Sequence, residues 1–129
     1  MSTLDAREAY EALAVTGEAC ARGIEIRCTS RGGAISYAVT YNSLHRVSYN
    51  RLIWTRIFMW AGRLTIEIRG RNLQPIIEAI RTRTCGFIQE YSEDEHIRPE
   101  TIDLDAPFIE SISVEVIGGR IPPAKPADV

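Results

Sequence analysis

The chain has 129 residues, of which 45% are hydrophobic and 25% charged, and 17 acidic against 15 basic residues give a formal net charge of −2. These values are typical of a soluble globular domain, whereas a disordered chain carries fewer apolar residues and a larger net charge. The longest apolar run, residues 52–62, is interrupted by Thr55 and Arg56, and a transmembrane helix needs about 20 apolar residues. The composition therefore excludes a disordered chain and a membrane-spanning helix.

Cysteine usage indicates a reducing compartment. Cys20, Cys28 and Cys85 are odd in number and share no Cys-x-x-Cys spacing, so neither a disulfide framework nor a zinc site is indicated. The N-terminus has no basic segment followed by an apolar one, so no signal peptide is expected. Fourteen of the 15 basic residues are arginine, which we attribute to codon bias in a GC-rich bacterial genome. We expect a cytoplasmic bacterial protein without metal or other cofactor.

The chain is expected to begin with a helix and to continue as a meander of strands. Residues 4–22 are rich in alanine and glutamate, with apolar residues near helical spacing, and Gly23 would end this helix. Apolar and polar residues then alternate between turn signals, which predicts five short antiparallel strands. These strands are expected near residues 24–29, 35–41, 47–49, 52–60 and 64–68.

A second helix is predicted after the fifth strand. Asn72 is expected to be its N-cap, and the apolar residues from Leu73 to Ile80 follow the i, i+3, i+4, i+7 pattern of one buried face. A strand near 87–91, a polar loop over 92–107 and a strand over 109–117 come next. We therefore predict one α+β domain, residues 1–120, with a bent antiparallel sheet of about six or seven strands and two helices. Residues 121–129, with three prolines, are expected to form a flexible tail.

The fourth strand is apolar on both faces and needs cover on both sides. The two predicted helices could supply this cover within one chain. Otherwise Trp54, Phe58 and Trp60 would form an exposed aromatic patch, and such patches usually mark a protein partner.

Charge is sorted along the chain. Residues 44–86 carry a net charge of +6 and residues 87–129 a net charge of −7. Three interpretations stay open: the acidic loop of Glu90, Glu93, Asp94 and Glu95 folds over the basic strands of its own chain, the two regions meet between copies, or the basic strands bind a polyanion. The candidate anion contacts are Arg46, Arg51, Arg56, Arg69, Arg71 and Asn72. Against nucleic acid, the overall charge is acidic, whereas nucleic-acid domains are usually basic.

Evidence for catalysis is thin. The Glu93–His96 run lacks the spacing of a calcium loop, and nothing in the sequence brings His45 to Cys28 or Cys85 with the third group that nucleophilic catalysis needs. The favoured hypothesis is a non-catalytic domain that self-associates or binds another protein, and polyanion or nucleic-acid binding is the alternative. A small-molecule or enzymatic site is the third hypothesis, and no membrane partner is expected.

Two segments carry a family resemblance. Residues 68–73 (Ile-Arg-Gly-Arg-Asn-Leu) with the following amphipathic helix, and residues 86–90 (Gly-Phe-Ile-Gln-Glu), resemble small uncharacterised bacterial proteins, which implies no activity. In element order, a meander closed by one helix resembles pleckstrin-homology-like rolls, and a leading helix before five strands resembles Sm-like barrels. Fold likeness of this kind does not fix function.

Overall fold

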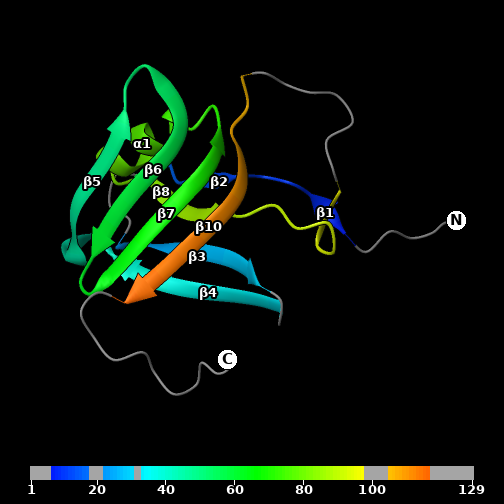
Figure 1. Ribbon diagram of the computed structural model, residues 1–129, viewed down its shortest axis with the longest axis horizontal. Helices are drawn as coiled ribbons and strands as arrows, with labels where there is room; N and C mark the ends of the chain where they lie inside the picture. The colour runs from blue at the N-terminus through cyan, green and yellow to red at the C-terminus, as the bar shows by residue number, and fades with distance from the viewer. Residues whose placement is uncertain (1–6, 18–21, 31–32, 98–104, 117–129) are drawn as a thin grey trace, which may run out of the picture.

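The computed structural model describes residues 7–17, 22–30, 33–97 and 105–116. Ten strands, one 3₁₀ turn (η1) and one α-helix make up this part of the chain (Figure 1). In chain order they are β1 (Glu8–Ala9), β2 (Leu13–Val15), β3 (Gly23–Ser30), β4 (Gly33–Thr40), η1 (Tyr41–Ser43), β5 (Leu44–Asn50), β6 (Ile53–Ala61), β7 (Leu64–Arg71), α1 (Gln74–Arg81), β8 (Cys85–Gln89), β9 (His96–Ile97) and β10 (Phe108–Val116).

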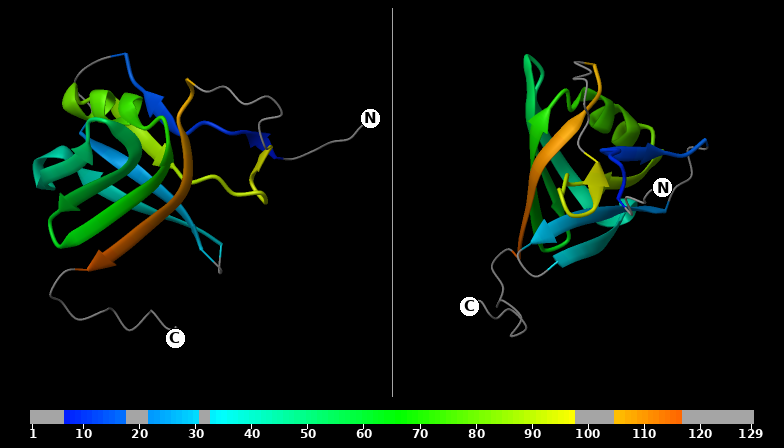
Figure 2. Two further views of the ribbon diagram at one scale, coloured as in Figure 1. Left: turned by 45° about the horizontal axis from the view of Figure 1, so that its top comes forward. Right: turned by 90° about the vertical axis from the view of Figure 1, so that its right-hand side faces the viewer.

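Two four-stranded sheets form the body of the molecule. The front sheet, which faces the viewer in Figure 1, has the antiparallel order β10-β7-β6-β5. The back sheet has the order β2-β8-β3-β4, in which β8 runs parallel to β3. The chain crosses from the back sheet to the front sheet at η1, and Figure 2 shows α1 and the back sheet together on the inner side of the front sheet. The front sheet therefore has one face on the core, and no element of the described residues packs on its other face.

Strict alternation of side chains explains both the strands and the core. Ile24 and Ile26 of β3, and Ile66 and Ile68 of β7, are fully buried, while the residues between them are not. Successive side chains of a strand point to opposite faces, so each strand contributes one apolar face. A single cluster of buried residues from both sheets and α1 results.

Helix α1 covers the core with the apolar face that the sequence predicts. Ile76, Ile77 and Ile80 are buried. The predicted N-cap is wrong: Leu73 holds the N-cap position without a side-chain hydrogen bond. Asn72 has a φ of 57°, in the left-handed region that asparagine tolerates better than most residues, and its Nδ2 donates to the Ala106 carbonyl at 3.4 Å. Asn72 therefore forms the corner between β7 and α1 instead of capping the helix.

The predicted N-terminal helix is wrong over the residues described. β1 pairs in parallel with β9, and β2 pairs antiparallel with β8. The Tyr10 hydroxyl donates to the Gln89 carbonyl at 2.7 Å and accepts from the Ile109 N–H at 3.0 Å. Helix propensity is a weak preference that tertiary contacts override, and here strand pairing and this anchored tyrosine override it.

The predicted fold class is wrong as well. Ten strands in three sheets, with β1 and β9 forming the third, and one α-helix make the described chain mostly β, not a six- or seven-stranded sheet with two helices. The Sm-like analogy lacks its leading helix, because the described residues before β3 form strands. Three strands follow α1, which departs from a pleckstrin-homology-like roll. The predicted tail, residues 121–129, lies outside the described residues.

Candidate interaction surface

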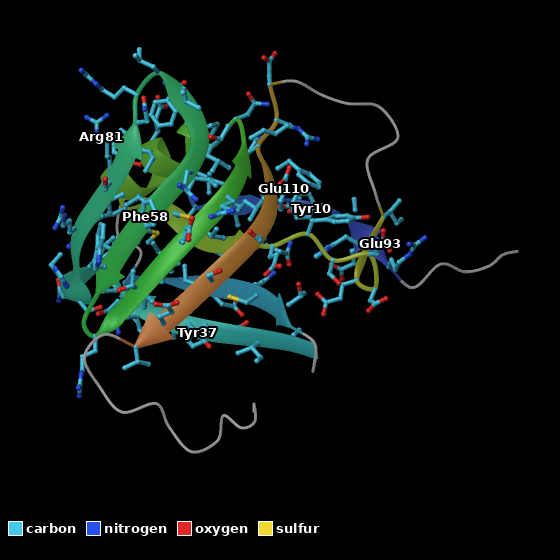
Figure 3. All side chains as sticks on the ribbon, viewed as in Figure 1. Tyr10, Tyr37, Phe58, Arg81, Glu93 and Glu110 are labelled. Atoms are coloured by element: carbon cyan, nitrogen blue, oxygen red, sulfur yellow. The ribbon has the colours of Figure 1, made fainter. Side chains whose placement is uncertain are left out.

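The outer face of the front sheet brings arginines and aromatic residues together. Cross-strand register places Arg46 opposite Trp60, and Phe58 opposite Glu67. Ile57 and Met59, the neighbours of Phe58, are fully buried, so the alternating set that includes Phe58 points outward. Figure 3 shows Phe58 on the front sheet.

Cations and rings alternate along this face. The Arg46 guanidinium lies 4.6 Å from the centre of the Trp60 ring, and the Arg56 guanidinium lies 5.6 Å from the centre of the Phe58 ring. The two rings stack at 6.0 Å with an interplanar angle of 23°. Such contacts at exposed sites contribute roughly 0.5–1 kcal/mol each. They hold two guanidinium groups beside aromatic planes on an accessible surface.

One carboxylate is shared between two arginines on the same face. Oε2 of Glu67 lies 2.7 Å from Nε of Arg56 and accepts a hydrogen bond from Nε of Arg69 at 2.8 Å. The hydrogen bond from Arg69, with the nearby charges of both arginines, holds the pKa of Glu67 below its usual value. Two cations against one anion leave this group with a net positive charge.

The hairpin tip, residues 49–54, carries the most exposed large apolar side chain of the described residues, Leu52, next to exposed Ile53. Leu52 is 90% exposed and Ile53 is 56% exposed. Asn50 Oδ1 accepts from the Leu52 N–H at 2.8 Å and fixes the turn, and the pairing of β5 with β6 is irregular beyond Tyr49. Large apolar side chains fixed in an exposed turn favour a protein partner.

The first and last residues of the hairpin tip carry stacked aromatic rings. Tyr49 and Trp54 stack at 5.3 Å with an interplanar angle of 21°. Trp54 packs against the core, and its carbonyl accepts from the Leu73 N–H at 3.1 Å. The structure therefore separates Trp54 from Phe58 and Trp60, which share the outer face.

A shallow hollow of about 630 Å³ lies beside the hairpin tip. Its lining includes the cations Arg51 and Arg56, the aromatic residues Tyr49 and Phe58, and Ile53. The hollow thus combines positive charge with apolar surface, which suits an anionic chain that also carries apolar groups.

The remaining candidate anion contacts lie at the end of β7. The Arg71 guanidinium lies 4.4 Å from the centre of the Phe108 ring, and its buried Nε has no hydrogen-bond partner among the described residues. Asn72 forms the corner described above. Of the six candidates, the front face brings together Arg46, Arg56 and Arg69, and the hairpin tip holds Arg51. Arg71 is the last residue of β7, and Asn72 follows it.

An acidic turn, residues 92–95, forms a second charged surface. The Ser92 N–H donates to Nδ1 of His96 at 3.0 Å, and the His96 N–H donates to the Ser92 carbonyl at 2.8 Å. The Glu8 N–H donates to the Glu95 carbonyl at 3.0 Å, which places the turn beside β1. The exposed carboxylates of this turn are Glu93, Asp94 and Glu95. Figure 3 shows Glu93 well away from Phe58, so the turn does not cover the front sheet.

The groups considered for catalysis are not brought together. His45 is exposed on β5, whereas Cys28 and Cys85 are buried in the back sheet. Burial raises the pKa of both thiols to about 12, and a protonated thiol is a poor nucleophile. Within the described ranges, no three His, Cys, Asp or Glu side chains are grouped to hold a metal ion.

Sequence reasoning missed the exposure of Leu52 and Ile53. The turn signal Asn50–Arg51 places both at a hairpin end, but apolar character alone predicts burial. Sequence reasoning also missed the ring cluster around Tyr10. The centre of the Tyr10 ring lies 5.2–5.5 Å from the ring centres of Tyr91, His96 and Phe108. No local pattern links residues so far apart in the sequence.

Comparison with known proteins adds no further assignment: no family model, curated protein or solved structure matches this chain. In the part of the chain that is described, the helix is too short and too polar to cross a membrane.

Proposed function

We propose that this chain is a non-catalytic interaction domain that binds an acidic segment of a protein at the hairpin tip and the adjoining outer face of the front sheet. The exposure of Leu52 and Ile53 beside Arg51 carries the proposal. A protein segment offers apolar side chains for the two aliphatic residues and carboxylates for the arginines. The expected location of the protein is the cytoplasm.

Binding energy at this surface comes mainly from the apolar tip. Fully burying a leucine or isoleucine side chain contributes roughly 1.5–3 kcal/mol, whereas an exposed ion pair contributes about 0–1 kcal/mol. The arginines therefore select an acidic partner and speed its encounter, and the aliphatic residues supply affinity.

The test compares one paired variant with a matched control. The tip variant, Leu52→Ser with Ile53→Ser, removes the apolar side chains of the hairpin tip. The control, Val15→Ser with Ile35→Ser, removes two aliphatic side chains of the back sheet that are 63% and 45% exposed. Fluorescence anisotropy of a labelled peptide of alternating glutamate and leucine measures binding. We expect the tip variant to weaken binding at least about tenfold, which is about 1.4 kcal/mol, and the control to leave it unchanged. Equal affinity of both variants contradicts the proposal.

Single-stranded nucleic acid is the second candidate. Phe58 and Trp60 present ring planes on an exposed sheet, with arginines beside them, which is the combination that stacks bases and contacts phosphates. In the same assay a labelled oligothymidylate would then bind more tightly than the peptide. Its affinity would fall steeply with salt and would not respond to the tip variant.

A further inference from the structure

Two exposed surfaces of opposite charge lie at separate places on the molecule. The hairpin tip, where β5 meets β6, presents Arg51 with Leu52 and Ile53. The acidic turn, beside β1, presents three carboxylates next to Ile97, which is 39% exposed. Figure 1 shows these two places well apart. Each surface thus combines one sign of charge with exposed aliphatic groups, and the two signs are complementary.

The acidic turn is held in place and does not reach the hairpin tip of its own chain. Besides the bond from Glu8, the Arg7 Nη1 donates to the Glu93 carbonyl at 3.3 Å. The ring of His96, which is buried, lies 5.2 Å from the ring of Tyr10. Because Tyr10 is itself bonded to β8 and β10, moving the turn would break contacts with the body of the domain.

We propose that the acidic protein segment is the acidic turn of a second copy of this chain, which binds the hairpin tip head to tail. The inference rests on the proposed function, because it names the occupant of the same surface. The carboxylates of one copy would lie against Arg51 and Arg56 of the next, and Ile97 would cover part of the exposed aliphatic tip. The segregation of +6 over residues 44–86 from −7 over residues 87–129 supports this pairing.

The contact joins two different surfaces, so it is heterologous. Each bound pair leaves one hairpin tip and one acidic turn free, and such contacts either close into a ring or extend into an open chain. Because the paired charges are exposed, salt should weaken the contact. The mass of the wild-type protein should therefore rise with concentration at low salt and fall as salt is added.

Two single-sided variants test the pairing. The charge-reversed tip variant, Arg51→Glu with Leu52→Glu, reverses charge at the hairpin tip. The turn variant, Asp94→Arg with Glu95→Arg, reverses charge at the acidic turn. A matched control, Val15→Glu with Arg63→Glu, makes the same kinds of change at exposed positions outside both surfaces. Light scattering gives the mass of each protein alone and in mixtures, and circular dichroism checks that each is folded.

Head-to-tail pairing predicts complementation. Each variant alone should be monomeric, with self-association weakened at least roughly a hundredfold by like-charge contact. Mixed together, they should form a one-to-one complex, because the unchanged acidic turn of one variant meets the unchanged hairpin tip of the other. The control should assemble as the wild type does.

Three results would overturn the pairing. The wild type could be monomeric at every concentration, each variant alone could still associate as the wild type does, or the mixture could stay monomeric. If the labelled acidic peptide still binds the wild type and is lost with the Leu52→Ser, Ile53→Ser variant, the proposed function stands and only the identity of the partner fails. If the peptide does not bind either, both fail.

Discussion

Glu67 controls how much positive charge the front sheet offers to a partner. Register places Arg56 directly opposite Arg69, and like charges in opposite positions of neighbouring strands destabilise a sheet. The carboxylate of Glu67 lies between them and contacts both. A single residue therefore makes a cationic face compatible with a stable sheet.

Replacing Glu67 by Gln should cost stability in a pH-dependent way. The pKa of Glu67 is lowered from 4.5 by Arg69 and Arg56. Its stabilising contribution is therefore complete above the unfolded value and is lost as pH falls through the lower, folded value. Urea unfolding should show Glu67→Gln to be less stable than the wild type by up to about 1 kcal/mol at neutral pH, and the difference should vanish in acid. Glu115→Gln, an exposed change on β10, is the control. A difference that persists below the folded pKa would show that the arginine contacts are not its source.

Among the elements, the pairing of β7 with β10 depends on a residue without a side chain. A Cβ at Gly70 would collide with the Phe108 carbonyl. At Gly17 no atom of the described ranges lies within 4 Å of the same position. Gly70, which directly precedes the candidate anion contacts Arg71 and Asn72, thus has a packing role.

Gly70→Ala should destabilise the domain by more than about 2 kcal/mol, because two backbones must move apart. Gly17→Ala should stay within about 0.5 kcal/mol of the wild type. Thermal or urea unfolding of the two variants measures the difference. Equal stability of both variants would mean that β7 and β10 do not approach as closely as the structure has them.

Elements with local patterns were predictable, and elements made by distant pairing were not. The strands from β3 to β7 and helix α1 follow from alternation and helical spacing within each segment. β1 and β2 become strands only because β9 and β8, about 70 or more residues later, pair with them. Likewise, the sequence identified Arg46, Arg56 and Arg69 as candidates, but only the register of three strands places them on one face. The exposure of Leu52 depends on the whole fold.

At the scale of the whole molecule, the two sheets share one core. Ile24 and Ile88 of the back sheet belong to the same buried cluster as Met59 and Ile66 of the front sheet. A domain of this size with one shared core usually unfolds in one step. The outer face and the hairpin tip can therefore vary in sequence without dividing the domain into independent parts.

Cooperative unfolding can be followed from both sheets at once. Cys28 and Cys85, with pKa values raised to about 12 by burial, report on the back sheet, and tryptophan fluorescence from Trp54 and Trp60 reports on the front sheet. In a Cys20→Ala background, we expect both thiols to resist a thiol-reactive probe until the urea concentration at which fluorescence changes, since opening either sheet exposes the shared core. Labelling well before the fluorescence transition would show that the back sheet opens by itself, and the single core would then not hold the sheets together.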